Sequence, residues 1–208
     1  MICKKNKKNN NKNIIDKIKE CSHKDKMNLV ISMFFLAISF LLDKIVISLV
    51  NTIQYPILFT LFYCITLLGE TYIFIWIVLF IAIALIINNH TIKKFIITLA
   101  VSAISEIILK TIINRPRPFE ALQINSTIIT NMSSFPSGHA MMFFAMIPIL
   151  SQKFPKIKIG VWIVAILVAL SRIYLGVHYF SDVVAGAIFG YYIGMIILQV
   201  GEKNVKKN

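Results

Sequence analysis

Charged side chains are scarce in this sequence of 208 residues, at 15% of the total, and only nine of them are acidic. A soluble domain of this length would carry more charge. The hydrophobic share of 57% and the mean hydropathy of +0.76 are instead typical of membrane proteins. We therefore expect an all-α, polytopic membrane protein with no room for a second sizeable domain.

Cysteine is scarce as well, and its spacing is uninformative. Cys3, Cys21 and Cys64 show neither metal-ligand nor CxxC spacing, which argues against a disulfide framework and a zinc site. Cys64 lies in an apolar run and is interpreted as a small hydrophobic residue. We also expect no cleavable signal peptide, because the first apolar run starts late, is long and lacks a small-residue cleavage site.

Residues 1–26 are basic, with nine lysines against Asp16, Glu20 and Asp25 among many asparagines, in a chain of net charge +13. We expect this segment to be a solvated cytoplasmic tail that is attracted to anionic lipid headgroups. It contains no interleaved aromatic residues, which argues against a nucleic-acid partner. A membrane domain is expected over residues 27–201, followed by a second cytoplasmic tail over residues 202–208.

The apolar segments predict a bundle of six membrane-spanning helices. These lie at about 28–49, 70–88, 93–113, 137–152, 157–175 and 179–200. Asp43 and Lys44 interrupt the first, which predicts an end near Leu42 and a continuation as an interfacial helix. Residues 51–69 contain Pro56 and predict either a segment along the outer interface or a continuation of that interfacial helix into the second span.

The distribution of basic residues sets the predicted orientation, because Lys and Arg accumulate in short cytoplasmic loops. With the amino terminus inside, 17 of the 22 basic residues fall on the cytoplasmic side, and both termini are cytoplasmic. The remaining five are Lys44, Lys110, Arg115, Arg117 and Arg172. Four of these five lie at the outer ends of the third and fifth spans, where we expect them to bind an anion.

The first of three polar stretches on the outer side is KTIINRPRP, residues 110–118. Its prolines end the third span and hold Arg115 and Arg117 in an extended turn near the membrane surface. Guanidinium groups bind phosphate oxygens bidentately, and Lys110 adds a point charge. Snorkelling interfacial cations are the alternative, which accounts for Lys110 alone better than for three cations together.

The second stretch is SFPSGH, residues 134–139, at the start of the fourth span. Pro136 suits a helix start, and Ser137 and Gly138 are predicted to expose free backbone N–H groups to an anion. Gly138 also allows a ligand to approach the backbone closely. His139 then lies in the first turn, where it can protonate a leaving oxygen. An ordinary capped helix start is the alternative.

The third stretch is SRIYLGVHYFSD, residues 171–182. On a helix, His178 and Asp182 would share one face, within hydrogen-bond reach of each other. The carboxylate can then hold one imidazole nitrogen protonated and leave the other basic, as a histidine nucleophile or base requires. Arg172 is a further candidate phosphate ligand. The alternative is a charge pair that only anchors a helix end.

Together these stretches resemble the three-part signature of the type-two phosphatidic acid phosphatase superfamily, which includes membrane lipid phosphatases. That signature is a Lys, six residues and Arg-Pro; then Pro-Ser-Gly-His; then Ser-Arg, five residues, His, three residues and Asp. The matching positions are Lys110, Arg117 and Pro118, then residues 136–139, then Ser171, Arg172, His178 and Asp182. The resemblance extends from about residue 55 to near the end of the chain.

The resemblance implies a mechanism that needs no metal and no cofactor. His178 would attack phosphorus and form a phosphohistidine, with Asp182 orienting and charging the imidazole. His139 would protonate the departing oxygen and later activate water. The groups expected to bind the phosphate are Lys110, Arg117, Ser137, Gly138 and Arg172. Arg115 lies outside the signature, and we expect at best an auxiliary contact with a headgroup.

We therefore expect an integral membrane phosphatase at the outer face of the cytoplasmic membrane, with a lipid substrate that enters from the bilayer. Undecaprenyl diphosphate is the first choice, and phosphatidate or phosphatidylglycerophosphate is a close rival. A phosphotransferase and a non-enzymatic anion or lipid transporter are the alternatives of other classes. The predicted spans argue against a soluble haloperoxidase, and no protein partner is predicted.

Two further patterns predict packing. Glu106 precedes Lys110 by four residues, which predicts an ion pair on one helix, with a proton relay as the alternative. Gly186, Gly190 and Gly194 form a stripe along the sixth span. Small residues at this spacing allow close helix contact in membranes, so we expect the stripe to fix the catalytic helix against its neighbours.

Overall fold

The computed structural model describes residues 11–67, 90–121 and 133–205. The chain divides into two compact units, one up to Ile38 and one from Ser39 onward. Within the described residues all regular structure is helical, as expected. The predicted second span, residues 70–88, lies outside the described residues.

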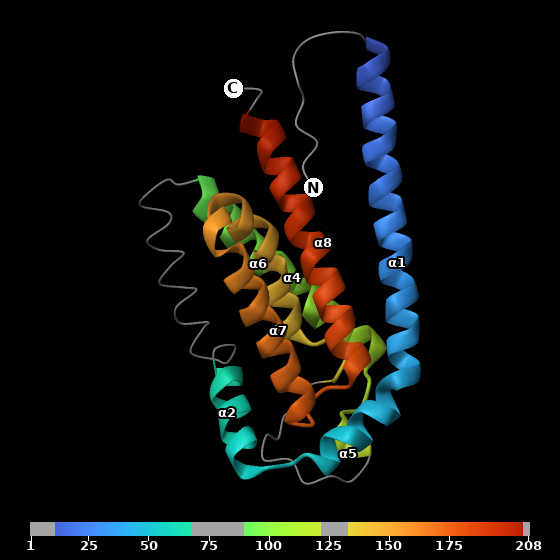
Figure 1. Ribbon diagram of the computed structural model, residues 1–208, viewed down its shortest axis with the longest axis vertical. Coiled ribbons are helices and arrows are strands. Elements are labelled where there is room, and N and C mark those ends of the chain that lie inside the picture. Colours follow the sequence, from blue (N-terminus) through green and yellow to red (C-terminus); the bar gives the residue numbers. More distant parts are fainter. Residues whose placement is uncertain (1–10, 68–89, 122–132, 206–208) are drawn as a thin grey trace. The chain divides into compact units, whose positions relative to one another are not determined.

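The described helices follow one another in the order seen in Figure 1. They are α1 (Asn11–Thr52), α2 (Pro56–Leu67), α4 (His90–Ile113), the short α5 (Pro118–Ala121), α6 (Gly138–Lys153), the 3-10 turn η1 (Pro155–Ile157), α7 (Lys158–Tyr174) and α8 (Phe180–Val205).

Four segments of the described chain are long and apolar enough to cross a membrane. They are Met27–Thr52, His90–Ile113, Pro155–Tyr174 and Phe180–Val200, at the positions of the predicted first, third, fifth and sixth spans. α6 takes the position of the predicted fourth span, but its 16 residues fall short of the roughly 20 that a straight crossing needs. The chain is thus a multi-pass membrane protein, and the count of six spans stays a prediction.

The first helix differs from its prediction at both ends. α1 begins at Asn11, within the segment expected to be a solvated tail. The helix continues past Asp43 and Lys44 to Thr52, as expected, but the apolar span also includes these residues and does not end near Leu42. Asp43 is buried, and its carboxylate binds partners within the protein, so its charge is compatible with a span.

Residues 53–67 do not continue α1, because the chain leaves the helix after Thr52 and α2 begins at Pro56. Tyr174, the last residue of α7, holds the connection between α1 and α2 by hydrogen bonds. Its hydroxyl donates to the carbonyl oxygen of Ile53 at 2.7 Å and accepts from the amide of Tyr55 at 3.1 Å. α2 packs against α7 as a result, and the hydroxyl of Thr66 on α2 reaches Arg172 on α7.

α6 lies at the centre of the second unit, in contact with α4, α7 and α8 (Figure 1). A cluster of buried apolar side chains connects α6, α7 and α8, formed by Ala140, Ala169, Ile173 and Val183. Large apolar side chains on other faces of these helices are exposed, such as Ile104 on α4 and Ile163 on α7. We assign those faces to the lipid, because apolar surface of this extent is unfavourable in water.

The predicted glycine stripe lies along the contact between α6 and α8. A Cβ atom at Gly186 or Gly190 would collide with the carbonyl oxygen of Ser137 or Met141, respectively, and one at Gly194 would collide with that of Ala145. The two helix backbones therefore touch directly along this line, as close packing of small residues in membranes allows. This contact holds the start of α8 beside the start of α6.

Gly190→Leu should separate α6 from α8, because the new side chain would meet the backbone of Met141 and not a movable side chain. Overpacking of this kind costs about 1–3 kcal/mol or more. We expect less monodisperse protein in detergent and a lower unfolding temperature. Gly160→Leu on α7 is the matched control, since nothing lies within 4 Å of a Cβ atom there. An unchanged yield and stability of Gly190→Leu would contradict this account of the stripe.

Candidate active site

The loop between α7 and α8 places His178. Gly176 has a φ of +68°, a left-handed conformation that favours glycine after the last turn of a helix. Its amide donates to the carbonyl oxygen of Ile173 at 3.0 Å, and the amide of His178 donates to that of Arg172 at 3.3 Å. His178 therefore precedes α8 and does not lie on it. The turn, and not a helical repeat, brings it near Asp182.

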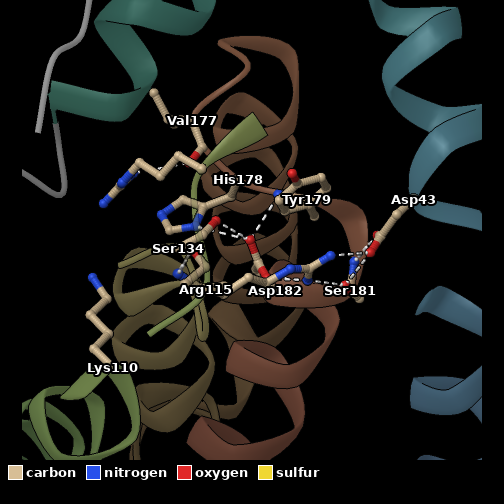
Figure 2. Close-up of polar contacts among 12 residues, drawn as sticks. Asp43, Lys110, Arg115, Ser134, Val177, His178, Tyr179, Ser181 and Asp182 are labelled. Carbon is tan, nitrogen blue, oxygen red and sulfur yellow. Dashed lines mark hydrogen bonds and ion pairs between the residues drawn. The ribbon is translucent and has the colours of Figure 1, made fainter. Parts of the chain in front are cut away.

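Asp182 lies in the first turn of α8, where its carboxylate is completely buried (Figure 2). Oδ2 accepts hydrogen bonds from the hydroxyl of Ser134 and from the amide of Tyr179, the latter at 2.9 Å. The bond to Tyr179 is half of a capping box, because an acidic residue in the first turn accepts from the amide that precedes the helix. Oδ1 accepts from Arg115 at 2.7 Å.

The imidazole of His178 faces this carboxylate, with Nδ1 at 3.6 Å from Oδ2 of Asp182. This distance is within ion-pair range and longer than a hydrogen bond. Nδ1 has no hydrogen-bond partner among the residues that the structure describes. Catalytic contacts commonly shorten in the complex with substrate, so Asp182 is the group placed to orient this ring.

Burial lowers the pKa of His178 to about 3, and the nearby charges of Arg117 and Arg172 lower it further, whereas Asp182 raises it. The imidazole is therefore neutral at physiological pH. A neutral ring with one nitrogen oriented by a carboxylate is the form in which histidine acts as a nucleophile.

Three buried cations surround the two histidines: Lys110, Arg117 and Arg172. α4 ends at Ile113, and Asn114 adopts a left-handed φ of 42° with its amide bonded to the carbonyl oxygen of Lys110 at 3.0 Å. This cap turns the chain towards Arg117, which donates to the carbonyl oxygen of Val177 at 2.9 Å.

His139 lies in the first turn of α6, within electrostatic range of Lys110, Arg172 and His178. Its ring is hydrogen-bonded to the backbone of Thr66, and its Nε2 has no partner among the described residues. The structure thus brings His139 together with the cations and His178, as the sequence predicts. The orientation leaves Nε2 able to exchange a proton with a ligand.

The start of α6 differs from its prediction in one respect. Ser137 is the N-cap, and its hydroxyl accepts from the amide of Ala140 at 3.5 Å. Its own amide is not free to bind an anion, because it donates to the carbonyl oxygen of Asp182 at 3.0 Å. The two helix starts are therefore joined. The amide of Gly138 has no such bond within the described part of the chain.

A carboxylate also lies at this helix start. Glu106 forms the predicted ion pair with Lys110, at 2.7 Å, which is thereby confirmed. The same carboxylate rests against Gly138, where a Cβ atom would collide with it. The close approach that glycine allows at this position is thus made by Glu106, and the charge of Lys110 is shared with it.

Arg115 has partners that the sequence does not predict. Its guanidinium group binds the carboxylates of Asp182 and Asp43, each at 2.7 Å. No role was predicted for Ser134, which binds Asp182, or for Thr66, which binds Arg172. The position of Asp43 within an apolar span could have indicated a functional carboxylate, and Ser134 could have been noticed because it lies next to the PSGH motif. Nothing in the sequence singles out Thr66.

Comparisons with known proteins agree with these motifs. The sequence profile described as the PAP2 superfamily matches residues 91–206, more than half of the chain. An undecaprenyl-diphosphatase of Sulfolobus acidocaldarius is 33% identical over 120 residues, which are 52% of this chain and 56% of that protein. Phosphatidylglycerophosphatase B of Bacillus subtilis is 33% identical over 107 residues, 46% of this chain and 51% of that protein. The chain spans about half the length of these curated relatives.

Two crystal structures have a similar fold. A transmembrane PAP2-type phosphatidylglycerolphosphate phosphatase from Bacillus subtilis has a TM-score of 0.68 at 24% identity, over 84% of this chain and 96% of that one. Aquifex aeolicus LpxE has a TM-score of 0.67 at 32% identity, over 76% of this chain and 95% of that one. On the profile match and these similarities, the chain belongs to the PAP2 superfamily.

Proposed function

We propose that this protein hydrolyses a lipid phosphate or diphosphate through a phosphohistidine formed at His178. One observation supports this above all. A neutral, buried histidine faces a carboxylate held by three hydrogen-bond donors, and three cations and a second histidine surround the pair. A binding protein for lipid phosphates would need the cations and would not need the oriented nucleophile.

In the first step the ring nitrogen of His178 that does not face Asp182 attacks phosphorus. The bound phosphate anion favours the protonated form of His139. The bond to the leaving oxygen breaks, and its electron pair stays with that oxygen, which takes the proton from His139. The phosphorylated imidazole is positively charged as it forms, and the carboxylate of Asp182 stabilises that charge. The dephosphorylated lipid then leaves.

In the second step water attacks the phosphohistidine. His139, now neutral, accepts the proton of that water, and the bond between phosphorus and His178 breaks to release inorganic phosphate. The three equatorial oxygens gain charge in both steps. Lys110, Arg117 and Arg172 are the groups placed to stabilise it. Gly138 can contribute its backbone amide, whereas Ser137 supports the site through its bond to Asp182.

The substrate class follows from the membrane setting and from the names of the relatives. Besides the two proteins above, a lipid A 1-phosphatase of Rhizobium etli is 30% identical over 105 residues, 48% of this chain and 45% of that protein. By their names all three act on phosphorylated lipids. We propose undecaprenyl diphosphate as the substrate, with phosphatidylglycerophosphate and phosphatidate as the nearest alternatives.

The orientation of the site is part of the proposal. Lys110, Arg117, Arg172 and His178 all lie at the ends of helices that the distribution of basic residues assigns to the outer side. We propose that the site faces outward, that both termini are cytoplasmic and that the membrane is the cytoplasmic one.

Purified protein in detergent should release inorganic phosphate from at least one of undecaprenyl diphosphate, phosphatidylglycerophosphate and phosphatidate. Excess chelator should leave the rate unchanged, because the proposed groups include no metal, and vanadate should inhibit as an analogue of the transferred phosphoryl group. Transfer of the phosphoryl group to an added alcohol in place of water would identify a phosphotransferase.

His178→Ala should lower the rate of release by about a thousandfold or more, as loss of a covalent nucleophile does in other enzymes. His90→Ala is the matched control, because His90 is exposed at the start of α4. Full activity in His178→Ala, or abolition of wild-type activity by the chelator, would contradict the mechanism.

Reporter fusions after Asn208 test the orientation. Green fluorescent protein at this position should fluoresce and alkaline phosphatase should be inactive, because we place the carboxyl terminus in the cytoplasm. The reverse pattern would put the site on the cytoplasmic face.

A further inference from the structure

We propose that Asp43 acts as a positioning residue for catalysis, because it shares the charge of Arg115 and so keeps Asp182 able to stabilise a charged His178. This inference rests on the proposed function. Neither Asp43 nor Arg115 belongs to the signature motifs. Figure 2 shows Arg115 between the carboxylates of Asp43 and Asp182.

Arg115 bridges two carboxylates. Its Nη1 donates to Oδ1 of Asp182 and to the hydroxyl of Ser181, both at 2.7 Å, and its Nη2 donates to Oδ2 of Asp43 at 2.7 Å. The guanidinium group also lies 3.8 Å from the ring centroid of Tyr179. A planar guanidinium group can stack on the ring and bind one carboxylate through each Nη atom, which an ammonium group cannot do.

Asp43 in turn is fixed by the start of α8. Its Oδ1 accepts from the amide of Ser181 at 2.8 Å, and its Oδ2 accepts from the hydroxyl of Ser181 at 2.6 Å. A carboxylate at this place is favoured by the free amides and the positive dipole end of the helix. Asp43 thus binds both Arg115 and the residue next to Asp182, and it is itself buried.

The charges explain why two carboxylates are needed. Arg115 paired with Asp182 alone would neutralise it, and a neutralised carboxylate stabilises a positive imidazole poorly. With Asp43 included, the three groups sum to one negative charge. That charge is available when His178 becomes positive on phosphorylation. Asp43 therefore acts on the reaction through Arg115 and Asp182 and does not touch the substrate.

A purely structural role for Asp43 is the competing explanation, in which the carboxylate only holds α1 against α8. The two explanations predict different values of kcat when the charges of Asp43 and Arg115 are both removed. If Asp43 serves to balance Arg115, removal of Arg115 should relieve the defect caused by removal of Asp43. If it is only a structural contact, the two losses should accumulate.

The test compares Asp43→Asn, Arg115→Gln and the double variant in the phosphate-release assay, with the lipid that the wild type hydrolyses best. Asparagine keeps the size of the side chain and an acceptor for Ser181. We expect kcat of Asp43→Asn to fall by about tenfold or more, the effect of weakening one charged hydrogen bond, with KM changed by less than about twofold. The double variant should have a higher kcat than Asp43→Asn.

Lys44→Gln is the matched control, since it removes the neighbouring, exposed charge of α1 and should leave kcat unchanged. A double variant slower than either single variant, or a normal kcat in Asp43→Asn, would overturn the proposal. If Asp43→Asn does not fold, Arg115→Lys replaces it, because lysine keeps the charge and loses the bridge. A wild-type kcat in Arg115→Lys would overturn the proposal equally.

The same assays distinguish a failure of the proposed role of Asp43 from a failure of the proposed function. If the wild type releases no phosphate from any lipid, the proposed function fails. If the wild type is active and His178→Ala is inactive while Asp43→Asn behaves as the wild type, only the role of Asp43 fails.

Discussion

The burial of Asp182 is the constraint on which the rest of the site depends. Burial of a charged carboxylate away from water costs several kcal/mol unless hydrogen-bond donors surround it. Here the donors come from three parts of the chain, namely Ser134, Tyr179 and Arg115. The backbone carbonyl of the same residue binds the amide of Ser137. One residue thereby connects the starts of α6 and α8, the turn after α4, and the loop that carries His178.

The membrane explains why so many of the other polar groups are paired. Basic side chains within or beside the spans are costly unless they meet an acceptor or a ligand. Lys110 meets Glu106, Arg115 meets two carboxylates, and Arg117 meets a backbone carbonyl. Shared charges of this kind hold Lys110 and Arg117 in position. In the proposed reaction a substrate phosphate would then contact groups that are already in place, which is the condition for effective electrostatic catalysis.

Features that depend on local chemistry could be predicted from the sequence. The helical class, four of the spans, the Glu106–Lys110 pair and the signature residues follow from hydropathy, spacing and motif. Contacts that depend on tertiary structure could not be predicted. Asp43 lies far from Arg115 in the chain and was interpreted as the end of the first membrane span. The amide of Ser137 was expected to be free, because no local pattern shows that Asp182 would accept its hydrogen bond.

The central claim is the covalent intermediate on His178, and chemical trapping tests it most directly. His139→Asn removes the proposed base of the second step. A diphosphate lipid releases a phosphorylated lipid, which can depart without protonation, so the first step should be slowed less than hydrolysis of the intermediate. The variant would be mixed with a diphosphate lipid that carries ³²P at its terminal phosphorus and quenched within milliseconds. We expect an acid-labile, alkali-stable label on the peptide that contains His178, at up to about one phosphate per active site. A label on another residue, or turnover by the wild type with no labelled intermediate in either protein, would contradict the account.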